Sequence, residues 1–455
     1  MLEHNSYHAV GRTASDIAAD VENAVRSGRL SAPTRLTSIR GLAADLGISP
    51  STVHAAYRQL ARRGVVVSDG ARGMRVSARS TVSARPALVV PADVRDLGNG
   101  NPDVDLLPPL EWALDTPLPS PYLYGADTIN DELCALAAAE LRTQGIDARA
   151  QMVVSGALDG IDRLLTATLR AGDRVLVEDP TYAELLDLLR AIDLVPVGVP
   201  IDDEGPLPQP FADALHGVRA AIITPRAHNP TGARITPPRA EDLRQAIASH
   251  AGVLVIENDN SALITGGPYT AVAPASDHWA IIQSVSKALG PDLRIAVATG
   301  DPATIAAAEG RQLLGPGWVS HILQETTLRL WRDPRTTALL SRAKSTYTTR
   351  RQTLIDALAS HGIEARGASG VNVYVPVSHE SAAAQRLLLD GWAVRTGEGY
   401  RVASGGPFVR ITTATLQPEV AAPLAEDIAN AAFPPRSPIP RAAQKTSRQS
   451  KANHH

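Results

Sequence analysis

The feature that most limits how this chain can fold is a series of short apolar runs, mostly separated by helix-length segments, between residues 151 and 299. Runs that are nearly continuous in Val, Ile and Leu are typical of strands buried on both faces, and helix-length connections are typical of parallel sheets. We therefore predict an α/β domain with a mainly parallel, seven-stranded sheet. Its expected strands are Gln151–Ser155, Arg174–Glu178, Val195–Pro200, Ala220–Thr224, Val253–Glu257, Trp279–Ser284 and Arg294–Thr299.

The sequence after this sheet predicts a long helical region at 324–358 and a smaller α/β unit. That unit has strands in GVNVYVPV and FVRITTA and a helix over 382–389. No run of about 18 apolar residues is free of charge, which disfavours a membrane span. The single cysteine, Cys134, excludes an intramolecular disulfide and a multi-cysteine metal site. We expect a cytoplasmic protein without a metal and without a membrane partner.

The N-terminal part of the chain differs from the rest in charge and pattern. Residues 1–85 carry a net charge of +6, residues 434–455 carry +5, and the remainder carries −14. Apolar residues at helical spacing predict three short helices, around 17–25, 37–46 and 52–64, with Ser49 as the N-cap of the third. Two β-prone runs, 65–67 and 74–76, then flank a turn that contains glycine. This order predicts a winged helix-turn-helix with an anionic partner.

The third helix of such a module fits the major groove of double-stranded DNA, while arginines contact phosphates. The exposed polar residues at the start of that helix, and the arginines suited to phosphates, are Ser49, Ser51, Thr52, His54, Arg40, Arg58 and Arg72. A small helical interaction domain with a solvated basic face is the alternative that the pattern leaves open.

Residues 27–77 closely resemble the winged helix-turn-helix of the GntR family of bacterial transcription factors. The resemblance rests on the order LTSIR, LA, LGIS, TV, AY, L and RRG, which continues into the wing. It implies that Arg40 and His54 contact DNA, and that Gly70 and Gly73 shape the wing tip. Family members often have Arg where this chain has Pro50, which predicts a difference in operator contacts.

One lysine is a candidate for covalent chemistry. The chain has four lysines, and Lys287, in SVSKALGPDLR, is the one that directly follows a predicted buried strand. A lysine amine can form a Schiff base with an aldehyde cofactor, and burial beside cationic groups favours its deprotonation. Ligands of parallel sheets bind at the carboxyl ends of the strands, where Lys287 is expected. For this residue alone, a surface lysine at a strand end is the alternative.

A phosphate site is predicted near Lys287. Gly156 and Ala157 follow a strand and open a helix, so their amides and the Ser155 hydroxyl are suited to hold a phosphate. Ser284 and Arg294 flank Lys287 and supply further donors.

Three other residues suit a planar cofactor ring. Tyr182, in EDPTY, is placed to stack on the ring, and Asn229, in HNPTG, to hydrogen-bond a ring hydroxyl. A carboxylate is needed to keep a pyridine nitrogen protonated, and Asp259, in IENDNSA, is the candidate.

Taken together, these motifs resemble the fold type I aminotransferases that depend on pyridoxal 5'-phosphate (PLP), from about residue 97 to residue 433. The resemblance rests on SVSKALGPDLR, HNPTG, EDPTY and YLYG. It implies that PLP is held as an aldimine on Lys287, that Tyr182 stacks on its ring and that Asn229 contacts O3′. The phosphate contacts that it implies are Gly156, Ala157, Ser284 and Arg294.

The same resemblance implies two further contacts. Tyr124, in YLYGADTIN, matches a tyrosine that reaches the phosphate in the neighbouring subunit, which implies a homodimer. Arg410, in FVRITTA, matches the arginine that binds a substrate α-carboxylate, for which a guanidinium fork is suited.

The sequence departs from the aminotransferase pattern in one motif. Relatives usually have an Asp directly after the acid that matches Glu257, and a Tyr two or three positions further on. This chain has Asn258, Asp259 and Asn260. If Asn258 rather than Asp259 faces the pyridine nitrogen, the nitrogen is not held protonated and the electron sink is weaker. A protein that binds the cofactor without turning it over tolerates both departures.

A winged helix joined to an aminotransferase-like domain resembles the MocR subgroup of the GntR family. The resemblance implies a DNA-binding transcriptional regulator that holds PLP on Lys287 and senses the cofactor or an amine or amino-acid effector. A working aminotransferase tethered by its basic module is the first alternative. The second is a regulator whose large domain only dimerises, without cofactor.

The predicted organisation has four segments. They are a winged helix-turn-helix over 1–79, a linker over 80–96, the PLP-binding effector domain over 97–433 and a disordered basic tail over 434–455.

Overall fold

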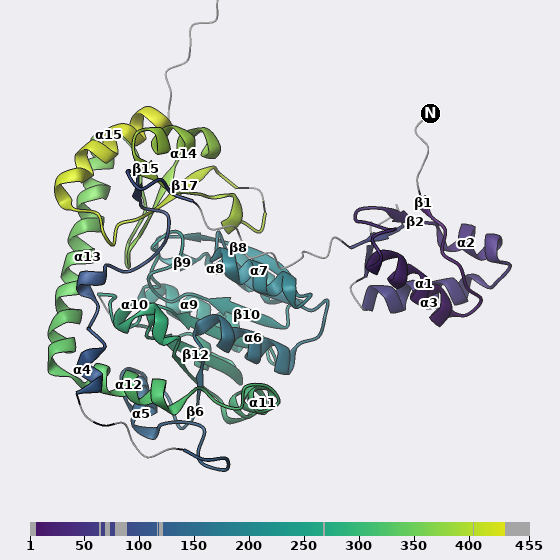
Figure 1. The fold of residues 1–455 in the computed structure, drawn as a ribbon, viewed down its shortest axis with the longest axis horizontal. Helices are drawn as coiled ribbons and strands as arrows, with labels where there is room; N and C mark the ends of the chain where they lie inside the picture. Colours follow the sequence, from purple (N-terminus) through teal and green to yellow (C-terminus); the bar gives the residue numbers. More distant parts are fainter. Residues whose placement is uncertain are drawn as a thin grey trace, which may run out of the picture.

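The computed structural model describes residues 6–62, 65–68, 73–77, 89–115, 117, 122–266, 269–403 and 405–432. These residues form an N-terminal helical module and a larger α/β body (Figure 1).

The N-terminal module contains the three predicted helices and the predicted hairpin. Its helices are α1 (Ala14–Arg26), α2 (Ile39–Leu46) and α3 (Pro50–Arg62). A four-stranded sheet of order β1-β2-β4-β3 completes it, with β1 at Ser6–Tyr7, β2 at Arg35–Leu36, β3 at Val66–Ser68 and β4 at Met74–Val76. The first two strands have two residues each, too few for an alternating pattern, so the sequence did not predict them.

One apolar core holds the three helices of this module together. Ile17 of α1, Leu42 of α2 and Val53 of α3 are fully buried in it. The buried Tyr57 hydroxyl donates a 2.7 Å hydrogen bond to the carbonyl oxygen of Thr37, which ties α3 to the residue before the cap of α2. The helical spacing of these apolar side chains therefore leaves the opposite face of α3 free for solvent or a partner.

The large body is built on an eight-stranded sheet of order β6-β13-β12-β11-β10-β7-β8-β9. Its strands are β6 (Ala150–Val154), β7 (Arg174–Asp179), β8 (Val195–Asp202), β9 (Gly205–Pro206), β10 (Ala220–Ile223), β11 (Leu254–Asp259), β12 (His278–Ser284) and β13 (Ala296–Gly300). The predicted seven strands are present, and the eighth, β9, is a Gly-Pro pair that gives no strand signal. Pairing is parallel from β12 to β8, whereas β13 is antiparallel to both its neighbours.

Helices cover both faces of this sheet (Figure 1). One core cluster packs the sheet against α6 (Ala157–Thr168), α7 (Ala183–Ala191) and α11 (Pro302–Leu313). The other packs it against α8 (Pro208–Leu215) and α9 (Pro237–Ala248). Along β11, Leu254 and Ile256 belong to the first cluster and Val255 to the second, because successive side chains of a strand point to opposite faces.

A second, smaller sheet lies in the C-terminal part of the body. It has the order β14-β17-β16, with β14 at Asn372–Pro376, β16 at Arg395–Thr396 and β17 at Phe408–Thr412. A two-stranded sheet pairs β5 (Arg95–Asp96) with β15 (Trp392–Ala393). Helices α14 (Glu380–Leu389) and α15 (Ala421–Ala432) pack on this unit. The strand Arg95–Asp96 lies inside the segment that the sequence analysis assigned to the linker.

Five further helices complete the described part of the body. They are α4 (Glu111–Leu114), α5 (Asp131–Arg142), α10 (Ser286–Leu289), α12 (His321–Arg332) and the long α13 (Pro334–Ser360). Single 3₁₀ turns lie at Val104–Leu106, Ala273–Ala275, Pro291–Leu293, Glu398–Tyr400 and Pro418–Val420.

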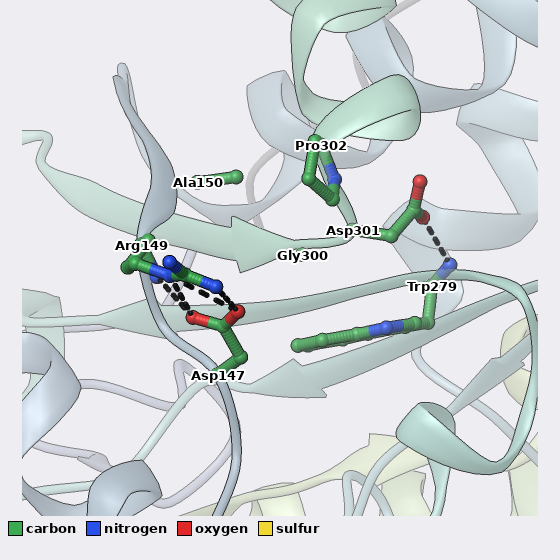
Figure 2. A pocket seen from close by; sticks show the side chains of 7 residues that line it. All are labelled: Asp147, Arg149, Ala150, Trp279, Gly300, Asp301 and Pro302. Carbon is green, nitrogen blue, oxygen red and sulfur yellow. Dashed lines mark hydrogen bonds and ion pairs between the residues drawn. The ribbon is translucent and has the colours of Figure 1, made fainter.

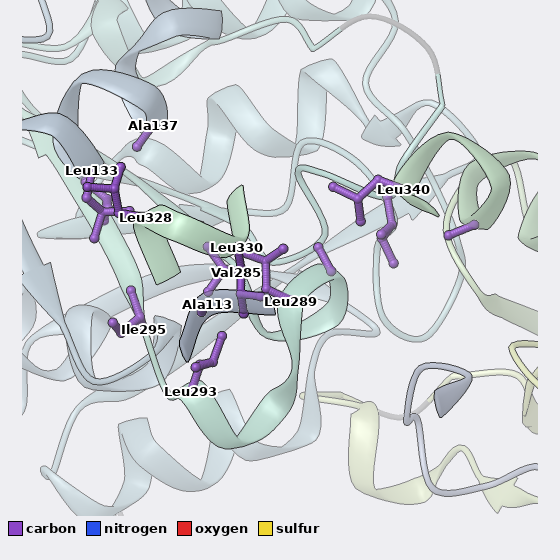
Figure 3. Close-up of a cluster of buried hydrophobic side chains, with 14 of the residues drawn as sticks. Ala113, Leu133, Ala137, Val285, Leu289, Leu293, Ile295, Leu328, Leu330 and Leu340 are labelled. Carbon is purple, nitrogen blue, oxygen red and sulfur yellow. The ribbon is translucent and has the colours of Figure 1, made fainter. Parts of the chain in front are cut away.

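A hydrophobic cluster anchors the short helix α10 on the body of the protein. Val285, Leu289 and Leu293, from α10 and the residues beside it, are buried in this cluster. Figure 3 shows these side chains together with Leu328 and Leu330 of α12. Burial of each large aliphatic side chain contributes about 1.5–3 kcal/mol, so the turn that carries Lys287 is held firmly in place.

One cavity lies away from the carboxyl ends of the parallel strands. It has a volume of about 520 Å³ and is lined by residues that include Trp279, at the start of β12, and Gly300, at the end of β13. In Figure 2, Arg149 lies directly against Asp147, and their 2.6 Å ion pair satisfies both charges. This cavity therefore offers no free reactive group. In the described part of the chain, no helix is long and apolar enough to cross a membrane.

Candidate cofactor and DNA-binding sites

A cavity of about 240 Å³ lies at the carboxyl ends of β10, β11 and β12, between the large sheet and the smaller one. Eight of the predicted site residues line it, namely Ala157, Tyr182, Asn229, Asn258, Ser284, Lys287, Arg294 and Arg410. Sequence reasoning missed several other lining residues, which include Asn99, Gly100, Glu184, Asn260, Ser261 and Asn372. Parallel strands bring these segments to one edge of the sheet although they are far apart in the sequence.

Lys287 lies on α10, directly after β12, and its amine is buried. Its Nζ donates a 2.5 Å hydrogen bond to the carbonyl oxygen of Gly100. Burial and the neighbouring Arg410 lower the pKa of Lys287 to about 8, whereas Glu184 acts in the opposite direction. A lysine with a pKa near 8 is partly neutral at physiological pH, which is the state required for attack on an aldehyde.

Glu184 supplies a carboxylate that the sequence analysis did not consider. It lies in the first turn of α7, two residues after Tyr182, and it lines the cavity at an exposed position. Its charge raises the pKa of both Tyr182 and Lys287, although burial is the larger effect on Tyr182. The EDPTYAE sequence contains the signal, because a residue so close to a ring-stacking tyrosine is expected at the same strand end.

Arg410 is a buried cation that faces neutral acceptors. Its Nη1 donates a 3.2 Å hydrogen bond to Asn229 Oδ1, and its Nη2 donates to the carbonyl oxygen of Gly98. Its guanidinium lies 5.6 Å from the centre of the Tyr400 ring. Burial lowers the pKa of Arg410. Among the residues that the structure describes, no carboxylate forms an ion pair with Arg410, so a carboxylate ligand would supply the missing counter-charge.

The backbone of residues 97–100, which directly follow β5, contacts both Lys287 and Arg410. Leu97 N donates a 2.9 Å hydrogen bond to the carbonyl oxygen of Ala393. The next carbonyl groups, of Gly98 and Gly100, then accept hydrogen bonds from Arg410 and Lys287.

The predicted phosphate residues cluster at the start of α6. Arg294 adopts a left-handed backbone, with φ of 49°, and its Nη2 donates a 3.3 Å hydrogen bond to the carbonyl oxygen of Ser155. Gly156 has φ of 93°, which favours glycine, and a Cβ atom there would lie 2.7 Å from Arg294 Nη2. Ala157 and Ser284 line the cavity, whereas Ser155 and Gly156 lie beside it. The helix start, the hydroxyl and the guanidinium together suit a phosphate.

Asn258 and Asp259 point to opposite faces of the large sheet. Asn258 lines the cavity, whereas the Asp259 side chain forms a bidentate ion pair with Arg226, at 3.0 and 2.8 Å. The candidate carboxylate Asp259 is therefore absent from the cavity, because alternation along β11 directs it, like Glu257, to the other face of the sheet. Burial raises the pKa of Asp259, and the Arg226 guanidinium counteracts this effect.

Tyr124 does not reach the cavity of its own chain. Its side chain is 94% exposed and meets the Trp318 ring edge-on, with 5.8 Å between the ring centres. Tyr122, nearby, stacks on His321 at 3.7 Å.

The predicted DNA contacts that the structure describes lie on α2, at the start and along α3, and beside β4. Ser49 caps α3, because its Oγ accepts a 3.2 Å hydrogen bond from Thr52 N, and it also bonds the hydroxyls of Ser51 and Thr52. Arg40, His54 and Arg58 are exposed. Gly73 has φ of 95°, a conformation that glycine adopts without strain. The predicted wing residues Gly70 and Arg72 lie outside the described residues.

Comparison with known families divides the chain in the same way. Residues 94–428 match the family model of aminotransferase class I and II, and residues 13–76 match that of bacterial regulatory proteins of the gntR family. The larger part of the chain therefore belongs to the aminotransferase class I and II family, whose cofactor is PLP. The additional gntR module makes the whole chain a transcriptional regulator of the MocR type.

Individual relatives share this organisation. The chain is 38% identical over 421 residues to the vitamin B6 salvage pathway transcriptional repressor PtsJ of Salmonella typhimurium, covering 92% of this chain and 98% of that protein. It is 26% identical over 398 residues to the transcriptional regulator TauR of Rhodobacter capsulatus, covering 77% and 80%. The fold is also similar to that of Pyrococcus horikoshii kynurenine aminotransferase in complex with PMP. That comparison has a TM-score of 0.66 and 19% identity, and it covers 75% of this chain and 91% of that one.

The cavity fits the cofactor of the family. It presents one buried amine, an aromatic face, an amide beside the buried arginine and a group of phosphate donors. Two polar atoms buried around it, Asn258 Oδ1 and Arg410 Nε, have no hydrogen-bond partner among the described residues. Unpaired buried polar atoms are costly, which indicates that a polar ligand completes the site.

The lowered pKa of Lys287 generates a test on the apoprotein. We expect the rate of covalent PLP attachment to rise with pH with a midpoint near 8, because only the neutral amine reacts. Glu184→Gln removes the charge that raises this pKa, so the midpoint should move to lower pH. The rate is measured from the visible absorbance of the attached cofactor.

The control is Glu241→Gln, on the exposed surface of α9, which should leave the midpoint unchanged. An identical midpoint in Glu184→Gln and the wild type would show that Glu184 does not act on Lys287.

Proposed function

We propose that this regulator binds PLP covalently through Lys287 and couples the occupancy of that site to operator binding by the winged helix. The observation that carries the proposal is the buried Lys287 amine, which shares one cavity with phosphate donors and a carboxylate-binding arginine. A gntR DNA-binding module in the same chain supports a regulatory role for the cavity rather than a metabolic one. A DNA-binding protein of this kind acts where the chromosome lies, in the cytoplasm.

The residues of the cavity have separate tasks in this proposal. Lys287 supplies the neutral amine, Ser284 and Arg294 hold the phosphate, and Tyr182 packs on the ring. Asn229 contacts the ring hydroxyl while it orients Arg410, to which it is hydrogen-bonded. When bound, PLP supplies an aldehyde carbon that combines reversibly with amines.

We infer two classes of effector from this set of residues. The first is PLP itself, in line with the relative that is named for vitamin B6 salvage. The second is an amine or amino acid that exchanges with Lys287 and places its carboxylate on Arg410. The two classes are linked, because an amino-acid effector would take the place of the Lys287 amine on the aldehyde carbon of bound PLP and release Lys287 as a free amine.

A working aminotransferase remains the second candidate, because the cavity retains Lys287 and Arg410 together. Steady conversion of an amino acid and a 2-oxo acid by the purified protein, lost in Lys287→Ala, would establish it. Such turnover requires proton transfer by the freed Lys287 and a strong electron sink.

We also propose a homodimer in which the partner's Tyr124 completes the phosphate site. Its support is the 94% exposure of Tyr124, an aromatic side chain that contributes nothing to its own cavity. An exposed aromatic group of this kind is typical of an interface.

The central test compares Lys287→Ala with Lys344→Ala. Lys287→Ala should keep the fold by circular dichroism but lose the visible absorbance of attached PLP and the adduct trapped by borohydride. PLP should change the operator affinity of the wild type by about 5- to 150-fold, the usual range of allosteric coupling, and should have no effect on Lys287→Ala. Lys344→Ala, on α13, should behave as the wild type. A trapped adduct in Lys287→Ala would assign the attachment to another lysine.

The DNA face has its own test. Arg40→Ala should weaken binding on all sequences and reduce the salt dependence by about one phosphate contact, because a lost phosphate contact carries no sequence information. His54→Ala should change the preference among operator variants. Fluorescence anisotropy over a salt series measures both, with Arg149→Ala in the large body as the control. Equal losses on all sequences for His54→Ala would remove it from base recognition.

The shared site is tested with hybrid dimers. A chain with Tyr124→Ala is combined with a chain with Lys287→Ala, so that one site of each hybrid has both native residues. We expect each homodimer to bind PLP weakly or not covalently, and the hybrid to regain one tight covalent site. No regain in hybrids would contradict the contribution of Tyr124 across the interface.

A further inference from the structure

The end of β11 places an amide, without a carboxylate, against the cofactor cavity. Asn258 is 3% exposed and lines the cavity, and its Oδ1 has no hydrogen-bond donor among the described residues. An unpaired acceptor buried in this way is costly unless a ligand pairs with it.

Both carboxylates that flank Asn258 are committed elsewhere. Asp259 is paired with Arg226, which also forms a 2.7 Å ion pair with Glu140. Glu257 accepts hydrogen bonds from the Tyr269 hydroxyl and from the backbone amides of residues 272 and 273. Releasing either carboxylate would leave buried donors unpaired, the Arg226 guanidinium in one case and a hydroxyl with two amides in the other, which is costly.

In the described part of the chain, a single carboxylate lines the cavity. This is Glu184, which is exposed and lies in the first turn of α7, on a different element from Asn258. Its charge acts on Tyr182, Lys287 and Arg410. Solvent screens an exposed charge, so Glu184 is poorly suited to hold a proton on a buried ring nitrogen.

We propose that Asn258 is the partner of the pyridine nitrogen and that this protein holds the nitrogen unprotonated. An amide has both a donor and an acceptor, so it can hydrogen-bond either form of the ring and does not select one by itself. The selection is electrostatic, because burial disfavours a cationic ring nitrogen and no opposite charge beside Asn258 compensates.

This inference rests on the proposed function, because it requires that PLP is held at Lys287. Beyond that function, it explains how the site distinguishes binding of an effector from its chemical conversion. A neutral ring nitrogen makes the cofactor a weak electron sink, so the α-proton of a bound amino acid is removed slowly. An amino-acid effector would then stay on the regulator unchanged, and the DNA-binding module would respond to its concentration rather than to its turnover.

The test is ¹⁵N NMR of the full-length protein loaded with PLP that is ¹⁵N-labelled in the ring. The chemical shift of the ring nitrogen separates its protonated and unprotonated forms. At pH 7 we expect the unprotonated shift in the wild type and a change toward the protonated shift in Asn258→Asp, which places a carboxylate at the same position. Glu184→Gln tests the carboxylate that lines the cavity, and the ring nitrogen should stay unprotonated in it; Glu241→Gln, on the exposed surface of α9, is the control.

Each other outcome overturns a specific part of the inference. A protonated shift in the wild type overturns it, and an altered shift in Glu184→Gln assigns the ring partner to Glu184 instead. If Asn258→Asp fails to fold, a wild-type titration decides, because the nitrogen should stay unprotonated over the pH range in which the protein is native. Absence of any PLP adduct on Lys287 in the wild type overturns the proposed function itself, and this inference with it.

Discussion

The chemistry of the cavity depends on the burial of one amine, that of Lys287. Lys287 lies on a single turn of helix, α10, which has too few residues to be stable alone. The turn persists because apolar side chains on both sides of Lys287 are buried against α12 and α5. This packing places the amine beside Arg410 in the cavity, and its burial together with the neighbouring guanidinium lowers its pKa to about 8. The reactivity of the site is therefore a consequence of the hydrophobic core beneath it.

Successive side chains of β11 point to opposite faces of the sheet, so two acids lie outside the cavity and an amide lines it. Glu257 and Asp259 share the face that packs against α8 and α9, whereas Asn258 shares the face of Leu254 and Ile256. Arg226 then neutralises Asp259 in a buried network. Asp259 is thus unavailable to the cavity although it is adjacent to Asn258 in the sequence. A chain with the acid one position earlier would have an aminotransferase-like electron sink.

The sequence predicted the parts of the structure that follow from periodicity or from contiguous motifs. Seven strands of the sheet, three N-terminal helices and the hairpin of the wing have enough residues to show their period. The strands β1, β2 and β9, which have two residues each, do not. Eight cavity residues were predicted because they directly follow buried strands or match a family motif. Glu184 and Gly100 were missed, because their positions depend on a helix turn and on a crossing segment that no periodicity reveals. The sequence alone did not show which of Asn258 and Asp259 faces the cavity, because this depends on which face of β11 each side chain shares with its buried neighbours.

The backbone that follows β5 has a consequence for signal transmission. Gly98 and Gly100 accept hydrogen bonds from Arg410 and Lys287, and β5 itself is paired to β15 of the smaller sheet. A ligand that captures either cation must compete for these two carbonyl groups. Loading the cavity would therefore remove hydrogen bonds that hold Gly98 and Gly100 against the body, and the backbone next to β5 would lose part of its anchorage.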